Sequence, residues 1–194
     1  MAEEAGQIEL EDEGAQRDPE DDARRRFALA QIRQYPDPAL RLAAREVEQV
    51  DDDVRRLAER MISLMHDAHG VGLAATQVGV LRRLFVFQTH DDAEPRAVVN
   101  PKLVDPSKEK STEDEGCLSL QGVLVPVERS VRVTLQGLDL DGNEVSYELD
   151  GLAARVAQHE SDHLDGVLIV DRTDRESRKQ AMAVLRPQPI LVGR

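Results

Sequence analysis

Apolar residues recur every three or four positions between residues 51 and 69, which is the period of one face of an α-helix. The repeating positions are Val54, Leu57, Met61, Leu64, Met65 and Ala68. Asp51 suits the N-cap of such a helix, and Asp52 and Asp53 suit the positive end of its dipole. Gly70 suits the C-cap. The pattern therefore predicts an amphipathic helix over residues 51–69 that ends at Gly70.

A second helix is predicted over residues 151–164. Its apolar and helix-forming positions are Leu152, Ala153, Ala154, Val156 and Ala157. Asp165 and Gly166 then supply a stop signal. We expect the apolar face of this helix to be buried, so that residues in its second half are carried toward the interior.

Short runs rich in β-branched and aromatic residues between these helices favour strands. They cover residues 84–87, 97–99, 131–135 and 144–149, and residues 167–170 are a candidate for one more short strand. Asp141-Gly142, between the last two runs before the second helix, favours a hairpin turn. The order of elements predicts an α+β fold in which antiparallel strands pack around a central helix.

The second predicted helix carries His159, Glu160 and His163 in an HExxH pattern. Residues four apart lie one above the other on a helix, so both imidazoles can bind one divalent metal ion. Glu160 is then placed to accept a proton from a water molecule on that metal. The pattern predicts metal-assisted hydrolysis. A short motif also arises by chance on polar helices, but the expected apolar face favours an inward-facing metal site.

A catalytic zinc-type centre usually has three protein ligands and one open position. No histidine follows His163, the other three histidines lie upstream, and the only later glutamate, Glu176, lies in a polar stretch. Cys117, the only cysteine, is the other candidate. A lone cysteine is more often a buried small hydrophobe, and as a nucleophile it would need an activating histidine. As a thiolate it would complete a Cys-His-His set.

Val71 and Gly72 follow directly after the first predicted helix and Gly70. Such a segment offers an exposed backbone edge along which an extended peptide can lie. A glycine-rich phosphate loop is the rival interpretation, and the absence of a following Lys-Ser or Lys-Thr disfavours it.

Three segments together resemble the motifs of peptide deformylases. They are residues 70–77 (GVGLAATQ), 115–119 (EGCLS) and 158–166 (QHESDHLDG), in that order. Residues 34–41 (QYPDPALR) are similar to the family's entry segment, and the resemblance covers about residues 27–172. The chain departs from the family at residues 121–126 (QGVLVP), where many members have a proline and, a few residues on, an arginine.

The resemblance implies that Cys117, His159 and His163 bind one divalent metal ion per chain, with Fe²⁺ expected. Ni²⁺, Co²⁺ or Zn²⁺ would fit the same ligands. A thiolate donates more charge than a third imidazole would. With Fe²⁺ it should also make the centre sensitive to oxidation.

The resemblance also implies a reaction, which is removal of the N-formyl group from the N-terminal formylmethionine of newly synthesised polypeptides. Glu160 would be the general acid/base. Gln77 and the backbone N–H of Leu118 would stabilise the oxyanion and bind the substrate. Gly72 would contact the substrate near the formyl group, and its neighbour Val71 would line the same backbone edge.

Length and composition predict one catalytic domain over residues 26–186, followed by a tail over residues 187–194. The 194 residues, 40% of them hydrophobic, suffice for one core. A single cysteine excludes an intrachain disulfide and fits a reducing compartment. Because the sequence has no run of about 18 apolar residues and no signal-peptide pattern, we expect a cytoplasmic protein without a membrane partner.

Charge is concentrated in residues 1–25, which hold ten Asp or Glu and three Arg and carry a net −7 of the total −13. With few large apolar side chains, this segment is predicted to be a disordered acidic extension. The overall acidity argues against direct nucleic-acid reading. Residues 172–186 contain five Arg or Lys. The resemblance suggests that this basic stretch docks on the ribosome, and a charged helix face is the favoured alternative.

Two other function classes stay open at this point. A zinc endopeptidase of the HExxH type would use a third ligand other than Cys117 and would cleave internal peptide bonds. A non-catalytic metal-dependent binding module would tolerate the loss of Glu160. Formyl-peptide hydrolysis is favoured because all three motifs occur together and in order.

Overall fold

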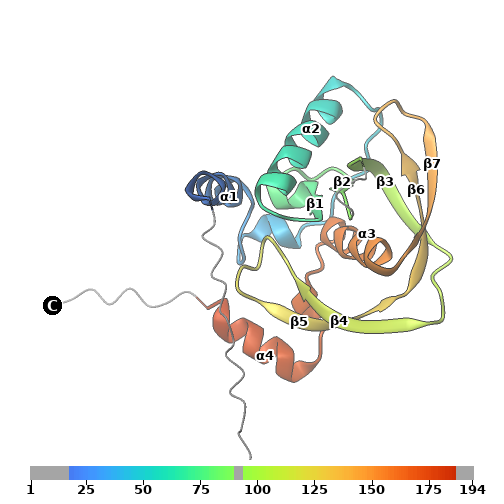
Figure 1. Cartoon of the computed structure of the whole chain (residues 1–194). Helices are drawn as coiled ribbons and strands as arrows, with labels where there is room; N and C mark the ends of the chain where they lie inside the picture. The colour runs from blue at the N-terminus through green and yellow to red at the C-terminus, as the bar shows by residue number, and fades with distance from the viewer. Residues whose placement is uncertain (1–17, 90–93, 187–194) are drawn as a thin grey trace, which may run out of the picture.

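A computed structural model describes residues 18–89 and 94–186 and has the α+β fold expected from the sequence (Figure 1). Its helices are α1 (Pro19–Gln31), α2 (Asp52–Asp67), α3 (Gly151–Leu164) and α4 (Arg175–Val184). Its short 3-10 helices are η1 (Pro38–Arg41), η2 (Ala75–Val78) and η3 (Ile169–Asp171). Its strands are β1 (Gly72–Ala74), β2 (Leu84–Phe87), β3 (Arg96–Val104), β4 (Lys110–Gly116), β5 (Leu124–Ser130), β6 (Arg132–Leu138) and β7 (Glu144–Asp150).

The strands form two antiparallel sheets. The larger has the order β1-β2-β3-β6-β7, and the smaller is the hairpin β4-β5. The four strands expected from the sequence are confirmed as β2, β3, β6 and β7. The expected hairpin joins β6 to β7, and Gly142 in its turn has a φ of +85°, which glycine adopts without steric cost.

Helix α3 lies between the two sheets and contacts strands of both (Figure 1). Its apolar face packs on the larger sheet, where it forms a buried cluster with residues such as Phe85 and Leu135. The helix ends at Leu164 with Asp165 as its C-cap, and Gly166 follows with a φ of +72°. The predicted helix is therefore confirmed, and its burial brings His163 to 1% exposure.

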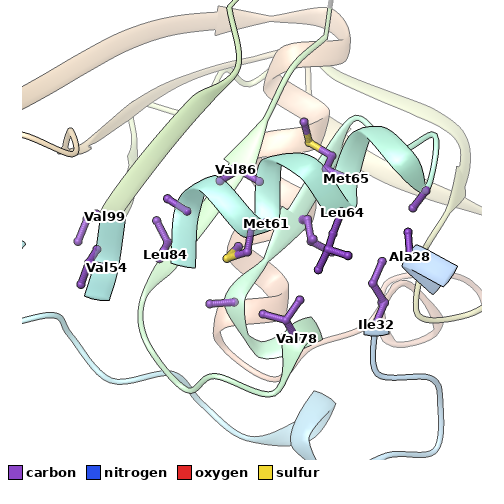
Figure 2. Close-up of a cluster of buried hydrophobic side chains, with 14 of the residues drawn as sticks. Ala28, Ile32, Val54, Met61, Leu64, Met65, Val78, Leu84, Val86 and Val99 are labelled. Atoms are coloured by element: carbon purple, nitrogen blue, oxygen red, sulfur yellow. The ribbon is translucent and has the colours of Figure 1, made fainter. Parts of the chain in front are cut away.

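Helix α2 packs against α1 and against strands β1 and β2 (Figure 2). The Asp51 carboxylate accepts a hydrogen bond of 2.9 Å from the backbone N–H of Val54, so the predicted N-cap is confirmed. Met61 and Met65 are fully buried in the cluster between these elements.

The predicted end of α2 at Gly70 is too late, because the helix ends at Asp67 and its C-cap is Ala68. His69 takes the left-handed conformation, with a φ of +58°. The N–H of His69 donates to the carbonyl of His66, and the N–H of Gly70 donates to that of Met65. This is the Schellman arrangement, with a histidine in the position where glycine is usual. Asp21 of α1 lies 3.0 Å from the His69 ring and holds it there.

The predicted boundary of the acidic extension at residue 25 is also too late, because α1 already begins at Pro19. The Asp18 side chain caps the first turn, and Pro19 suits its first position. Glu20, Asp21 and Asp22 suit the positive end of the helix dipole. The acidic charge that suggested disorder therefore stabilises a helix start. Residues 1–17 and the tail 187–194 lie outside the described residues.

Residues 167–170 do not form the strand that we expected. The backbone enters η3, in which the N–H of Asp171 donates to Leu168 and the Asp171 carboxylate accepts from the Leu168 N–H. Leu168, Ile169 and Val170 are buried with β5 and α4, and a short apolar run is compatible with either structure. The charged helix face expected in the basic stretch is confirmed as α4.

Strands β4 and β5 were missed by sequence analysis. Of the seven residues of β4, only Glu115 is buried, so no apolar alternation marks the strand. Among the described residues, no helix is long and apolar enough to cross a membrane.

Met61→Ala is expected to lower the free energy of unfolding by about 2–5 kcal/mol, because it leaves a cavity between α2 and the sheet. Chemical denaturation monitored by circular dichroism measures this change. Glu59→Ala, at an exposed position of the same helix, is the control and should change stability by less than about 0.5 kcal/mol. Equal stability of the two variants would show that α2 is not part of the core.

Candidate metal centre

Cys117, His159 and His163 converge in the interior, although the cysteine lies more than forty residues upstream in the chain. Cys117 follows the last residue of β4, and the two histidines lie one turn apart on α3. One donor atom from each residue lies within 4.8 Å of the other two. The Cys117 Sγ atom is 3.2 Å from Nε2 of His163.

This donor set fits a divalent ion. Ligand atoms at about 2.0–2.3 Å from a tetrahedral ion lie about 3.3–3.8 Å from one another, close to the 3.2 Å between Cys117 and His163 and within the 4.8 Å limit for all three donors. One thiolate and two imidazoles leave one coordination position open, as catalytic centres require. The three residues that the HExxH motif and the lone cysteine suggested are therefore brought together by the fold.

The orientation of His159 is set by Glu115. Its Nδ1 atom is 3.0 Å from a Glu115 carboxylate oxygen, which leaves Nε2 free for an ion. Burial lowers the pKa of His159, but hydrogen bonds with Cys117 and Glu115 outweigh burial and raise that pKa well above its usual value. A carboxylate behind a ligand histidine is the arrangement that fixes the tautomer in metal centres.

The pKa of His163 is shifted in the opposite direction. Burial and the neighbouring His159 lower this pKa well below the usual value. Both histidines bind a metal ion only as neutral rings, so an ion would displace the proton that the raised pKa of His159 favours. The hydroxyl of Thr76 in η2 donates to the backbone carbonyl of His163 at 3.1 Å. The Nδ1 atom of His163 is buried and has no hydrogen-bond partner among the described residues.

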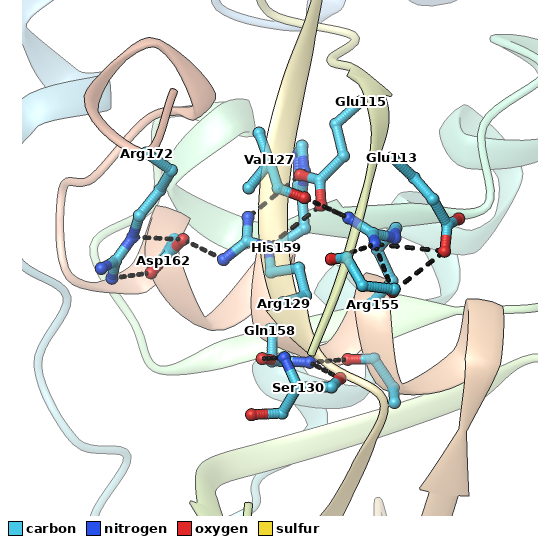
Figure 3. Close-up of polar contacts among 12 residues, drawn as sticks. Glu113, Glu115, Val127, Arg129, Ser130, Arg155, Gln158, His159, Asp162 and Arg172 are labelled. Atoms are coloured by element: carbon cyan, nitrogen blue, oxygen red, sulfur yellow. Dashed lines mark hydrogen bonds and ion pairs between the residues drawn. The ribbon is translucent and has the colours of Figure 1, made fainter. Parts of the chain in front are cut away.

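Glu115 also belongs to a buried network of charges between the hairpin and α3 (Figure 3). It pairs with Arg129 of β5 at 3.0 Å and with Arg155 of α3 at 2.8 Å. Burial alone would raise the pKa of Glu115, but hydrogen bonds from His159 and Arg129 lower it to about 2. The carboxylate is therefore ionised at neutral pH, and its two arginine partners balance its charge.

Arg129 extends the network to the other side of α3. It donates to Asp162 at 2.6 Å, and Asp162 also pairs with Arg172. Asp162 and His163 are neighbours on α3, so the network holds the helix on both sides of the histidine pair.

Sequence analysis missed this network. The available signal was that Arg129 shares one face of β5 with the buried Val125 and Val127.

Glu160 faces the centre from α3 and is only 4% exposed. Burial raises its pKa to about 7, against the attraction of His159. One of its carboxylate oxygens is buried without a hydrogen-bond partner among the described residues. A carboxyl group with this pKa can accept and return a proton near neutral pH.

Gly72 makes room for the Glu160 side chain. A Cβ atom at position 72 would lie 2.4 Å from Oε1 of Glu160 and 2.8 Å from Cγ1 of Val156. Real Cβ atoms essentially never lie this close to another atom, so a side chain at position 72 would displace Glu160 or Val156. Gly72 pairs with Phe87 of β2, and the carbonyl of Val71 accepts from the N–H of Gln88.

Gln77 lies beside the centre at the end of η2. The N–H of Ala74 donates to its Oε1 atom at 2.8 Å, so its amide nitrogen must face the other way. That nitrogen lies 3.1 Å from the Ser119 hydroxyl and 3.7 Å from Cys117 Sγ. The N–H of Leu118 makes no hydrogen bond with any other described residue. The N–H of Leu118 can therefore donate to a bound molecule, whereas the Gln77 nitrogen would first give up its contact with Ser119 or Cys117.

A cleft of about 730 Å³ opens onto these groups. Its walls include the catalytic candidates and the exposed apolar side chains Val71, Leu124 and Leu152. All eight residues that the sequence suggested lie at or beside this cleft. The cleft is large enough for a short extended peptide.

Comparison with known proteins was made on both sequence and structure. A family model described as polypeptide deformylase matches residues 29–179. Peptide deformylase 1 of Corynebacterium glutamicum is 46% identical over 162 residues, which are 82% of this chain and 96% of that protein. The peptide deformylase of Acidothermus cellulolyticus is 46% identical over 160 residues, which are 82% of this chain and 87% of that protein. The structure of peptide deformylase from Ehrlichia chaffeensis in complex with actinonin is similar with a TM-score of 0.76 and 38% identity, covering 79% of this chain and 93% of that chain.

Glu115→Gln is expected to weaken metal binding by about 10–100-fold, because the amide no longer holds His159 through a charged hydrogen bond. It should also lower stability by about 3 kcal/mol, because Arg129 and Arg155 lose their counter-charge in the interior. Anaerobic titration of Ni²⁺ against a chelator measures the affinity.

Glu113→Gln is the matched control for Glu115→Gln. Glu113 lies two residues away on β4 and also pairs with Arg155, but its side chain is 61% exposed. Its loss should therefore change metal affinity by less than about twofold, since exposed ion pairs contribute little. Equal affinities of the two variants would exclude a role for Glu115 in orienting the ligand.

Proposed function

This chain belongs to the polypeptide deformylase family, a metal-dependent hydrolase family, and from that premise we propose which residues carry its reaction. The enzyme removes the N-formyl group from newly synthesised polypeptides. The observation that carries the assignment of residues is the convergence of Cys117, His159 and His163 beside Glu160 in one cleft. The alternative of a zinc endopeptidase is not favoured, because both the sequence relatives and the structural neighbours are peptide deformylases.

Cys117, His159 and His163 would hold one divalent ion per chain, and Fe²⁺ is our proposal for its identity. Such an ion lowers the pKa of a water molecule to about 7 in favourable cases and polarises a carbonyl. The same ligands suit Ni²⁺, Co²⁺ and Zn²⁺. Anaerobic purification followed by elemental analysis tests the identity, and oxygen-dependent loss of activity would support iron.

Gln77 and Leu118 are proposed to bind the oxygen of the formyl group. The amide nitrogen of Gln77 is directed toward Cys117 by the bond from Ala74 to its oxygen. The N–H of Leu118 follows Cys117 directly in the chain. These donors would bind more strongly as negative charge develops on the formyl oxygen, and each is worth about 3–4 kcal/mol in comparable sites.

Glu160 is proposed to transfer the proton. Its carboxylate takes a proton from the attacking water, and the oxygen of that water forms a bond to the formyl carbon. When the carbon–nitrogen bond breaks, the same carboxyl group gives the proton to the departing amine. The products are formate and a peptide with a free amino terminus. Burial favours this role because no bulk water competes for the carboxylate.

The peptide would lie along the cleft wall formed by Val71 and Gly72, at the edge of the larger sheet. Strand β1 is the last strand of that sheet on this side, so an extended peptide can pair with its backbone. The exposed side chains of Leu124 and Leu152 offer apolar contacts across the cleft. An unbranched apolar side chain such as methionine suits these walls.

Ribosome docking through residues 172–186 and a cytoplasmic location stay proposals. The docking proposal depends on positive charge. Part of that charge is neutralised by ion pairs within the chain, because Arg172 pairs with Asp162 and Arg178 pairs with Asp171. Arg175 and Lys179 are the cations of α4 that remain for an external partner, although Lys179 lies 4.0 Å from Glu176. Cosedimentation with ribosomes after charge reversal at Arg175 and Lys179 tests this surface.

Glu160→Gln is expected to bind metal as the unaltered protein does and to lower kcat on formyl-Met-Ala-Ser by at least about 10²–10⁴-fold, because no other group near the water can take its proton. Elemental analysis and formate release measure the two properties on the same sample. Glu148→Gln, at an exposed position on β7, controls for the loss of one negative charge. Retained turnover by the Glu160 variant would rule out its role as general acid/base.

Gly72→Ala is expected to lower kcat by about 10–100-fold, because the new methyl group must displace the Glu160 side chain. Metal content should not change, since the three atoms nearest to the new methyl group belong to Glu160 and Val156 and not to a metal ligand. The double variant Gly72→Ala/Glu160→Gln should be no slower than Glu160→Gln alone. Fully additive losses would mean that Gly72 acts on the substrate and not through Glu160.

A further inference from the structure

The segment of residues 33–35, which follows α1, joins the two parts of the backbone that carry the oxyanion donors. The N–H of Arg33 donates to the carbonyl of Gln77 at 2.7 Å, and the N–H of Tyr35 donates to the carbonyl of Ser119 at 2.9 Å. Gln77 is itself one proposed donor, and Ser119 follows the other, Leu118. A shift of this short segment would therefore move both proposed oxyanion donors, Gln77 and Leu118.

Gln34 lies between these two backbone contacts, and its side chain uses both ends of its amide. Its Nε2 atom donates to the carbonyl of Leu118 at 3.0 Å and to that of Ile32 at 3.2 Å. Its Oε1 atom accepts from the Nε2 atom of Gln121 at 2.9 Å. One half-buried side chain thus contacts the loop after Cys117 at two points.

Gln34 is anchored to the end of α1. Ile32 is 3% exposed and packs with Ala28 and Leu29 against α2. The carbonyl of Ile32 accepts from Gln34, so the glutamine amide is tied to the buried end of α1. A side chain anchored on a packed helix can restrain a loop in a way that a free surface side chain cannot.

The loop that Gln34 contacts contains two consecutive turns. The N–H of Leu120 donates to the carbonyl of Cys117 at 3.0 Å, and the N–H of Val123 donates to that of Leu120 at 3.3 Å. Gly122, the third residue of the second turn, has a φ of +75°. This combination defines a type II turn, in which Gln121 is the second residue. Proline is favoured at that position because its ring fixes the required φ.

We propose that Gln34 is a positioning residue that fixes the Leu118 peptide and the following turn, so that the Leu118 N–H is aimed at the formyl oxygen. The contact between Gln34 and Gln121 replaces the rigidity that a proline at position 121 would give to the turn. The proposal rests on the proposed function of Leu118, because it explains how that donor is held. The side chain of Gln34 hydrogen-bonds to Ile32, Leu118 and Gln121, and to neither the metal ligands nor Glu160.

Gln34→Leu tests the proposal, because leucine removes all three side-chain hydrogen bonds and leaves an apolar side chain of comparable size. On formyl-Met-Ala-Ser, kcat should fall about tenfold while KM stays within about twofold, since the misplaced donor matters most as charge develops. Amide hydrogen exchange of the metal-loaded protein should speed up at Tyr35, Leu120 and Val123, whose N–H groups donate in or beside this loop.

Rescue by proline separates positioning from a general loss of stability. Gln34→Leu/Gln121→Pro should recover at least half of the lost kcat and slow the exchange of Val123, because the ring restrains the turn without Gln34. Gln121→Ala removes only the contact between the two glutamine side chains, and it should give a smaller loss of the same kind. This exposed position also keeps the test informative if Gln34→Leu does not fold.

Leu135→Ala is the stability control, since Leu135 is fully buried in the separate cluster around α3 and that cluster includes no residue of the loop. It should lower the Tm yet leave exchange at Leu120 and Val123 within about twofold of the unaltered protein. Unchanged exchange and kcat in Gln34→Leu would overturn the proposal, and so would a kcat loss that proline does not recover. If the unaltered metal-loaded enzyme released no formate, the proposed function would fall, while the exchange data would still decide whether Gln34 holds the loop.

Discussion

The carboxylate of Glu115 is the contact on which the architecture of the metal centre depends. It lies on β4, next but one to Cys117, and binds His159 and Arg155 of α3. One buried anion therefore fixes the distance between the segment that carries the thiol and the helix that carries the two imidazoles. Removing two ions from water is costly, and Arg129 offsets this cost by pairing with both Glu115 and Asp162. Because the charges are mutually satisfied, the network can hold α3 in one orientation between the two sheets.

Close backbone approach is the second constraint, and it places the proton-transfer group. Gly72 lets β1 pass within contact distance of α3, which leaves Glu160 beside the cleft and out of bulk water. The oxyanion donors come from other segments, since Gln77 ends η2 and Leu118 follows β4. Residues 33–35 hydrogen-bond to both of these segments. The site is therefore built from several parts of the chain. Each part is held by residues that contact the reacting groups but do not react themselves.

The sequence predicts the elements whose pattern is local. Helix α2 and helix α3 are evident from apolar spacing, and His159, Glu160 and His163 are evident from spacing within one helix. The end of α2 and the position of β4 depend on contacts with distant parts of the chain, which no local sequence pattern reveals. His69 stands where glycine is usual at the end of α2, and its ring is bound by Asp21, which is far away in the chain. Strand β4 is polar and is defined by pairing with β5. The roles of Glu115 and Gln34 depend on partners that are forty or more residues away. The candidate ligands could therefore be found from sequence, but the residues that orient them could not.

The central claim is that one sulfur and two imidazole nitrogens bind the same ion. X-ray absorption spectroscopy of the anaerobically purified protein tests this directly, because sulfur and nitrogen ligands differ in both scattering and distance. The account predicts one sulfur at about 2.3 Å and two imidazole nitrogens at about 2.0–2.1 Å, with remaining scattering from light atoms. A first shell of nitrogen and oxygen alone, with no sulfur at bonding distance, would contradict it.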